Sequence, residues 1–569
     1  MTHYNEVTMK RFILIVLGVL LGNGLSLGDE DRQKGVEIIG KTHSIAAFQS
    51  FSGPGASINS LANTYDMSLF EFNLGGKQAL FNGSGITTNS NFPLTDGEAF
   101  TNNTHLGISK SFSQNVKAGV TGEFYTLAGD RTVGRVFGEE LPWDDFPRDV
   151  KGAIQPPHIH MDLYHAFLEG RHEKWQYKIV GGNLSPRELP EFTRKEMNQV
   201  KLGSLVYRAP STNNSFFEKE DRKIEEGRHP MRGFDVMGRY EYQEKKSVNW
   251  EVFGGAAKPT PISDIERDAY GGRVAGDLGN GNIGVTYVFQ QGQRHTSQVE
   301  ENQGVWAVDA SYGLYDWIVP YFTFAQTDYE RETTTESHRG HAYVGGLFFR
   351  LPKKYEVKIQ YQRLDENYDL IAVHKTEHYP GNMEGVSFQT MLPLTEQFKL
   401  KGVYYYLQQL ETVTSTGDTL FGDNFFPSLA SSRKGTLDIQ RVGAEWKATP
   451  KLSLNSYVEH ARFKKKASTV ATSIDKDVYN FAIGWNLSLT NQITLETSYR
   501  RFMSLGDWQA MSFDSYQEIP EAVIRYQLNK DCRAYMIYHY YNFEDSNPSS
   551  FGRNDYYGHQ VILETKIAL

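Results

Sequence analysis

One pattern recurs along most of this chain and limits what it can fold into. An amphipathic segment is followed by a very short polar turn, a second amphipathic segment and then a longer connection. In residues 478–489, VYNFAIGWNLSL, apolar side chains occupy every second position, and polar or small residues such as Asn480 and Ser488 lie between them. A period of two places the two sets on opposite faces of an extended strand. We therefore expect β-strands that lie between an apolar and a polar environment.

The pattern gives ten hairpins between residues 105 and 541. The first joins HLGISKSF to VKAGVTGEFYTL, and the last joins AVIRYQL to RAYMIYHYY. The terminal stretch HQVILETKIAL adds one strand, and a first strand is expected within residues 36–82, in IAAFQSF or SLFEFNL. The total is about 22 strands, with 18 to 24 as the range. QVKLGSLVYRA, at residues 199–209, is a possible further strand.

The connections favour one fold class. Turns of a few residues alternate with long stretches such as ENYDLIAVHKTEHYPGNMEG, and this asymmetry is typical of outer-membrane barrels, with short periplasmic turns and long extracellular loops. Strands that cross hydrocarbon must close into a ring, because lipid satisfies no backbone hydrogen bond. The fold class predicted is all-β, a transmembrane antiparallel up-and-down β-barrel. The alternation alone also permits a soluble sheet with one solvated face.

The N-terminus predicts export. Lys10 and Arg11 precede the apolar run FILIVLGVLL, and Ser26 and Gly28 fit a cleavage site after Gly28. Residues 1–28 are therefore predicted to be a signal peptide, with a retained anchor as the alternative and Met9 as a possible start. Residues 29–569 would form the barrel, and residues 29–100 would be an N-terminal segment containing the first strand or strands. The predicted location is the bacterial outer membrane, with its lipid as a partner.

The charges on the polar faces are the candidate functional residues. Alternation places Glu356 and Lys358 on the face opposite Val357 and Ile359, and a lysine at the middle of a bilayer would cost about 2–4 kcal/mol. The candidate pore-lining residues are Glu356, Lys358, Arg441, Glu445, Lys447, Glu459, Glu496, Arg500, Glu521, Arg525 and Arg533, with Glu564 and Lys566 on the last strand. They predict a channel for small hydrophilic solutes or oligosaccharides. In the alternative interpretation, these charges pair across strands and only solvate the wall.

Two long connections are candidates for narrowing such a pore. They lie near Arg131–Pro157 and Ser185–Gly233. A ring of about 22 strands is wide enough for an aqueous channel unless something fills it.

Several other classes of site are not predicted. Cys532 is the only cysteine, which excludes an intrachain disulfide and a cysteine-rich metal site. The His158–His160 and His338–His341 pairs lack an evident third ligand, so we predict no metal and no cofactor. The net charge of −9 is spread along the chain, and no basic patch suggests nucleic acid. No grouping of Ser, His and an acid indicates an enzyme, so we predict none, with an outer-membrane enzyme as a further alternative.

GNGNIG, residues 279–284, matches the glycine pattern of dinucleotide-binding loops. Such a loop must open a helix whose N-terminus holds the pyrophosphate. The following VTYVFQQ alternates as a strand, so we predict a hairpin turn instead.

Over nearly its whole mature length the chain resembles bacterial outer-membrane porin-type barrels. DLYHAFLEG with WQYKIVGGNL resembles a hairpin of the alginate-export and related porin families, which often have Gly-Arg-Gln where this chain has Gly181-Gly182-Asn183. The resemblance implies a channel but carries over no substrate. Large barrels of this kind also sheathe multihaem cytochromes, which gives a second hypothesis: a sleeve or scaffold for a partner. A TonB-dependent transporter would have a similar strand count, but a plug domain would be expected before its barrel.

The terminal strand resembles the recognition signal that the outer-membrane assembly machinery reads in this class. The residues of its apolar face are Val561, Leu563, Thr565, Ile567 and Leu569. The class usually ends on Phe or Trp, whereas this chain ends on Leu569. The sequence gives no indication of oligomeric state.

Overall fold

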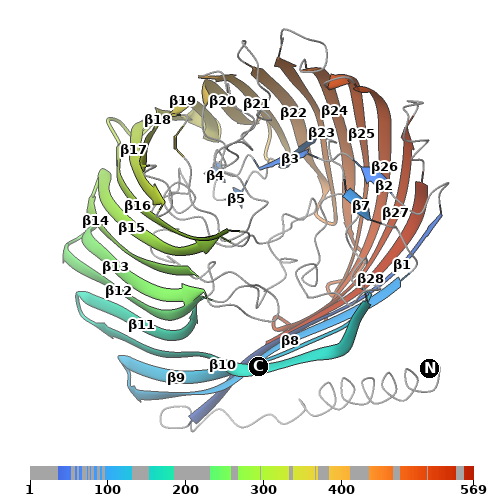
Figure 1. Ribbon diagram of the computed structural model, residues 1–569. Coiled ribbons are helices and arrows are strands. Elements are labelled where there is room, and N and C mark those ends of the chain that lie inside the picture. Colours follow the sequence, from blue (N-terminus) through green and yellow to red (C-terminus); the bar gives the residue numbers. More distant parts are fainter. Residues whose placement is uncertain are drawn as a thin grey trace.

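A closed ring of strands dominates the computed structural model (Figure 1). The structure describes residues 36–52, 58–60, 63–66, 73–74, 77–78, 82–85, 90–92, 97–130, 153–184, 231–257, 267–294, 297–331, 337–365, 367–368, 383–410, 435–465, 474–508, 511–545 and 556–568. The predicted signal peptide and the possible strand at residues 199–209 lie outside these ranges.

The ring is a single 22-stranded sheet in which every pairing between neighbours is antiparallel. From β8 to β28 each strand pairs with the next in the sequence, and β1 closes the ring by pairing with both β8 and β28. The strands of the ring are β1 (Val36–Ser52), β8 (Gly97–Ser113), β9 (Val116–Asp130), β10 (Ala153–His172), β11 (Trp175–Leu184), β12 (Met231–Gln243), β13 (Lys246–Ala257), β14 (Arg267–Leu278), β15 (Gly281–Arg294), β16 (Ser297–Tyr312), β17 (Ile318–Arg331), β18 (Ser337–Leu351), β19 (Tyr355–Leu364), β20 (Met383–Pro393), β21 (Phe398–Gln409), β22 (Thr436–Thr449), β23 (Leu452–Lys465), β24 (Ile474–Ser488), β25 (Ile493–Trp508), β26 (Met511–Gln527), β27 (Cys532–Asp545) and β28 (Tyr556–Ala568). The predicted fold class and strand number are confirmed.

All ten predicted hairpins are present, from β8–β9 to β26–β27. Their connections gather at one end of the barrel, called here the short-turn end. Lys245 (φ 59°) and Gly279 (φ 90°) adopt left-handed backbone in two of these turns. Gly279 joins β14 to β15, so the prediction that GNGNIG forms a hairpin turn is confirmed. A short 3₁₀ helix, η3 (Pro352–Lys354), joins β18 to β19.

The opposite end, called here the long-loop end, has connections such as residues 185–230 between β11 and β12. Strict alternation of short and long connections is wrong at two places. Only residues 295–296 join β15 to β16, and only residues 509–510 join β25 to β26. In both hairpins the pairing continues to the tip, as Trp508 opposite Met511 shows.

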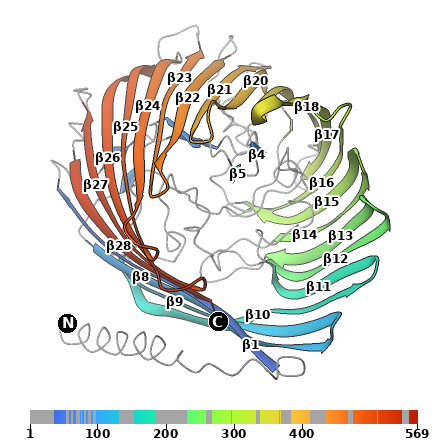
Figure 2. The same cartoon turned by 180° about the vertical axis from the view of Figure 1, so that it is seen from behind.

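The segment between β1 and β8 carries three nested antiparallel strand pairs. The pairs are β2 (Ile58–Ser60) with β7 (Ser90–Phe92), β3 (Asn63–Asp66) with β6 (Asn82–Gly85), and β4 (Asn73–Leu74) with β5 (Lys77–Gln78). Together they make one interrupted hairpin at the long-loop end. In both axial views its strands lie within the outline of the ring (Figures 1 and 2). The predicted strand IAAFQSF lies within β1, whereas only Asn73 and Leu74 of SLFEFNL are described.

Candidate functional site

The two faces of the wall differ in chemistry, as β19 illustrates. Ile359 is 46% exposed, and Tyr361 beside it on the same face is also exposed. On the other face, Lys358 is 2% exposed and Gln360 and Gln362 are buried. Large apolar side chains are likewise exposed on one face of the other strands, for example Val274 on β14, Val442 on β22 and Leu563 on β28. An exposed apolar face and a polar inner face are what a barrel needs if lipid surrounds it.

Every candidate pore-lining residue lies on the inner face. Lys358, Glu459, Glu496, Arg500, Glu521 and Glu564 are buried; Glu356, Arg441, Glu445, Arg525, Arg533 and Lys566 are partly exposed; and Lys447 is exposed. The assignment of these side chains to a pore remains a prediction.

A charged arc covers the inner face from β22 to β28. Arg441 on β22 donates from Nε to Glu459 on β23 at 2.7 Å. The same guanidinium lies 4.5 Å from the ring centre of Tyr457. The pair is mostly buried, so its geometry is fixed by three side chains from two neighbouring strands.

Farther round this arc, a carboxylate is held on each of two strands. Glu496 accepts a hydrogen bond from Asn486 at 3.0 Å, and Arg525 lies 3.6 Å from it. Glu521 lies 2.8 Å from Nε2 of His539, whose Nδ1 is 3.1 Å from Gln560. The cross-strand pairing considered as the alternative interpretation is therefore present for several of these charges.

Other predicted charges are not brought together. Within the described part of the chain, Lys447 and Arg533 form no ion pair. Both lie toward the short-turn end of their strands, Lys447 on β22 and Arg533 on β27. They leave positive charge at that end of the inner wall.

A buried ion pair that the sequence did not predict lies on the opposite arc. Arg273 on β14 forms two bonds to Asp309 on β16, at 2.6 and 2.9 Å, and one to Thr286 on β15 at 2.8 Å. The arginine passes over β15 at Gly284. Alternation within WAVDASYG places Asp309 on the polar face, and this signal was available.

A neutral patch on β17–β21, called here the amide–tyrosine patch, was not predicted from the sequence either. Its members are Tyr321, Gln360, Gln362, Ser387, Gln389 and Tyr405, all buried. Tyr321 donates to Gln360 at 2.9 Å, and Gln360 donates to Gln362 at 3.1 Å. Gln389 lies 2.6 Å from the Tyr405 hydroxyl. The sequence signal for this patch is glutamine at every second position of KIQYQ, which places neutral polar side chains on the inner face.

Burial of the inner wall changes along the strand axis. On β22, Leu437 and Ile439 are buried, whereas Glu445 is partly exposed and Lys447 is exposed. Arg441 lies at the boundary between the two zones. On β22 the inner face is thus covered toward the long-loop end and open toward the short-turn end.

The described residues contain no group of three or more His, Cys, Asp or Glu able to hold a metal ion. His341 lies 3.0 Å from Asp365 on the outer face, and His158 and His160 lie within β10. Cys532 is a free thiol at the start of β27. In the part of the chain that the structure describes, no helix is long and apolar enough to cross a membrane.

The predicted assembly signal lies on β28, which pairs with β1 and β27. Leu563 is exposed on the outer face, with Val561, Thr565 and Ile567 on the same side. Leu569 lies outside the described residues. Recognition of this strand by assembly machinery remains a prediction.

No model of a protein family matches the chain, and no curated protein matches it either. Solved structures to which it is similar include outer-membrane channels and receptors. The outer membrane channel DcaP of Acinetobacter baumannii is 11% identical, covering 96% of this chain and 100% of that one, with a TM-score of 0.28. The ferric enterobactin receptor PfeA of Pseudomonas aeruginosa is 10% identical over 95% and 82%, with a TM-score of 0.43. The ferric citrate transporter FecA is 8% identical over 93% and 78%, with a TM-score of 0.47. Channels and receptors both occur among them, so the likeness does not choose between these functions.

Proposed function

We propose that the protein is a channel of the bacterial outer membrane that passes small hydrophilic solutes or oligosaccharides. One observation carries the proposal: a closed ring of 22 antiparallel strands with apolar side chains exposed outside and polar side chains inside. Hydrocarbon accepts only a sheet without free edges, and the outer face matches it. The polar inner face offers hydrogen bonds to solutes that hydrocarbon would exclude.

The inner wall supports selectivity that is local rather than uniform. The charged arc has both signs, and its ion pairs leave little net charge where they form. Lys447 and Arg533, which form no ion pair with other described residues, lie toward the short-turn end, where Lys447 is exposed and Arg533 is partly exposed. A mobile ion entering from that end therefore meets positive charge before it reaches the Arg441–Glu459 pair.

Conductance across a planar lipid bilayer tests this proposal. We expect the purified protein to produce discrete current steps that grow with salt concentration. Replacing Lys447→Glu together with Arg533→Glu should shift the reversal potential in a salt gradient toward cation selectivity, because the two positive charges at the open end become negative. Lys110→Glu, an exposed lysine on the outer face at the same end, is the matched control and should leave the reversal potential unchanged.

The alternative hypothesis, a sleeve around a partner such as a multihaem cytochrome, gives a different result in the same assay. A sleeve purified alone would show no discrete steps, and a haem protein would copurify with it from the native membrane. Absence of current steps, together with a copurifying haem protein, would contradict the channel proposal.

A further inference from the structure

The outer face of the barrel changes from apolar to charged near the long-loop end. On β17–β19 the apolar surface ends in a row of aromatic side chains, Phe324, Tyr343 and Tyr361. The rings of Phe324 and Tyr343 lie 5.1 Å apart. Aromatic rows of this kind lie at the boundary between hydrocarbon and headgroups. The side chains immediately beyond the row therefore lie at headgroup level.

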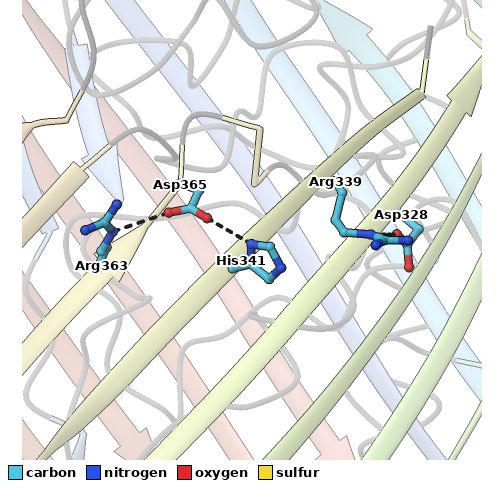
Figure 3. A network of polar contacts seen from close by, with 5 residues as sticks. All are labelled: Asp328, Arg339, His341, Arg363 and Asp365. Atoms are coloured by element: carbon cyan, nitrogen blue, oxygen red, sulfur yellow. Dashed lines mark hydrogen bonds and ion pairs between the residues drawn. The ribbon is translucent and has the colours of Figure 1, made fainter.

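Two aspartate-held arginines occupy that level (Figure 3). Arg339 on β18 donates from Nε to Asp328 on β17 at 2.6 Å, and its side chain is 66% exposed. Arg363 on β19 donates from Nε to Asp365 at 3.3 Å, and its side chain is 48% exposed. His341 lies against Asp365 at 3.0 Å (Figure 3). Because each aspartate holds the Nε side of its arginine, the terminal N–H groups remain at the surface.

Two further outward arginines lie farther round the ring, and each meets its carboxylate through a terminal nitrogen. Arg462 on β23 donates from Nη2 to Asp475 on β24 at 3.1 Å, and Nη1 of Arg501 on β25 lies 3.5 Å from Glu518 on β26. Arg501 follows the outward Tyr499 by two residues, as Arg363 follows Tyr361. We call Arg339, Arg363, Arg462 and Arg501 the arginine collar.

The short-turn end lacks such a collar. There the outer face ends in exposed aromatic side chains such as Trp317, Trp446 and Tyr526. Among strand residues whose side chains the structure describes, no outward-facing arginine occupies that end. Among the described strand residues, the two rims therefore differ in chemistry, and outward-facing guanidinium groups occur only at the long-loop end.

We propose that the arginine collar binds the phosphate groups of lipid headgroups in the leaflet at the long-loop end. A guanidinium presents a planar fork of donors that matches phosphate oxygens, and this match gives recognition by geometry as well as by charge. The paired carboxylates lower the net positive charge of the collar, and those of Arg339 and Arg363 hold Nε and leave the terminal N–H groups toward the surface. The collar thus selects a phosphate held at the depth of the aromatic row.

Lipid retention by the purified full-length barrel tests the proposal. Wild type, in neutral detergent, is mixed with phosphatidylglycerol and with a diacylglycerol of the same acyl chains, and bound lipid is counted by native mass spectrometry. We expect wild type to retain the phosphatidylglycerol preferentially. The variant Arg339→Gln/Arg363→Gln/Arg462→Gln/Arg501→Gln should lose about tenfold in retention, the effect of roughly one charge-assisted hydrogen bond.

The control removes four exposed lysines near the short-turn end, with Lys110, Lys354, Lys451 and Lys530 each changed to Gln. It should retain phosphatidylglycerol as wild type does, and heat-dependent gel migration checks that all variants fold. Equal losses in the control and the collar variant, or no loss in either, would overturn the proposal. Displacement of the lipid by inorganic phosphate at matched concentration would identify a site for the free ion and would also overturn it. None of these outcomes depends on whether the barrel conducts.

Discussion

At the scale of single residues, glycine allows long side chains on the inner wall to reach partners across an intervening strand. At Gly284 an added Cβ would lie 2.2 Å from Nη2 of Arg273, so only glycine leaves space for this side chain to reach Asp309 across β15. At Gly346 an added Cβ would lie 2.6 Å from the Tyr321 hydroxyl, which crosses β18 to Gln360 in the same way. Both polar networks therefore depend on a missing side chain on the intervening strand.

We expect Gly284→Ala to destabilise the barrel by about 3 kcal/mol, because displacing Arg273 breaks a buried ion pair. Unfolding in urea from detergent micelles measures the effect. Gly276→Ala on β14 is the control, since its nearest contact would be an ordinary 3.9 Å to Leu278, and it should change stability little. Equal stability of the two variants would show that the Arg273–Asp309 pair does not need the gap.

At the residue scale, the sequence predicted on which face of a strand these side chains lie, but not which residues they contact. Alternation was enough to put Glu459, Arg500 and Glu521 on the inner face, because a strand has only two faces. It did not show that Arg273 reaches Asp309, since that contact depends on the register of three strands and on the gap at Gly284. The amide–tyrosine patch was not predictable for a related reason. Its neutral side chains come from four strands, and only the register of these strands brings them together.

At the scale of elements, the hairpins were predictable because hydrocarbon imposes the alternation on each strand. The positions at which the strands end were not predictable. Beyond the apolar band no face must be apolar, so the polar residues near Arg294 and Ser297 continue the pairing of β15 and β16 without an alternating sequence. For this reason the alternating pattern predicts loops between β15 and β16 and between β25 and β26, where the structure has continuous hairpins.

The face of β19 predicts the effect of adding a charge. Ile359→Lys places an ammonium group on the exposed apolar face, and we expect a loss of about 2–4 kcal/mol in lipid. Asn455→Lys, on the exposed part of the inner face of β23, introduces the same side chain toward water and should cost little. Refolding into lipid vesicles, followed by urea titration, compares the two variants. A similar cost for both would mean that the two faces do not meet different solvents.

At the scale of the whole molecule, closure followed from a physical requirement more than from any motif. A ring was expected because an open edge in lipid leaves backbone groups unsatisfied, and β1 supplies the missing strand between β28 and β8. The filling of the ring could not be derived in this way. Burial of Leu437 and Ile439 on the inner face depends on how the connections fold, and connections at the long-loop end have no repeating pattern.

Closure is testable through the pairing of β1 with β28. Ala46 lies opposite Leu563 in this pairing, and Phe48 lies opposite Val561. In a Cys532→Ser background, Ala46→Cys with Leu563→Cys should form a disulfide, because Cα atoms directly opposite in an antiparallel pair are about 4.5–5.5 Å apart. The bond would tie most of the chain into one covalent loop, so the denatured protein should migrate faster on a non-reducing gel.

Ala46→Cys with Val561→Cys is the matched control, since diagonal positions are about 7–8 Å apart and should cross-link far less. Equal cross-linking of both pairs would mean that the two strands meet without a fixed register, and the ring would then have a seam rather than a continuous ladder.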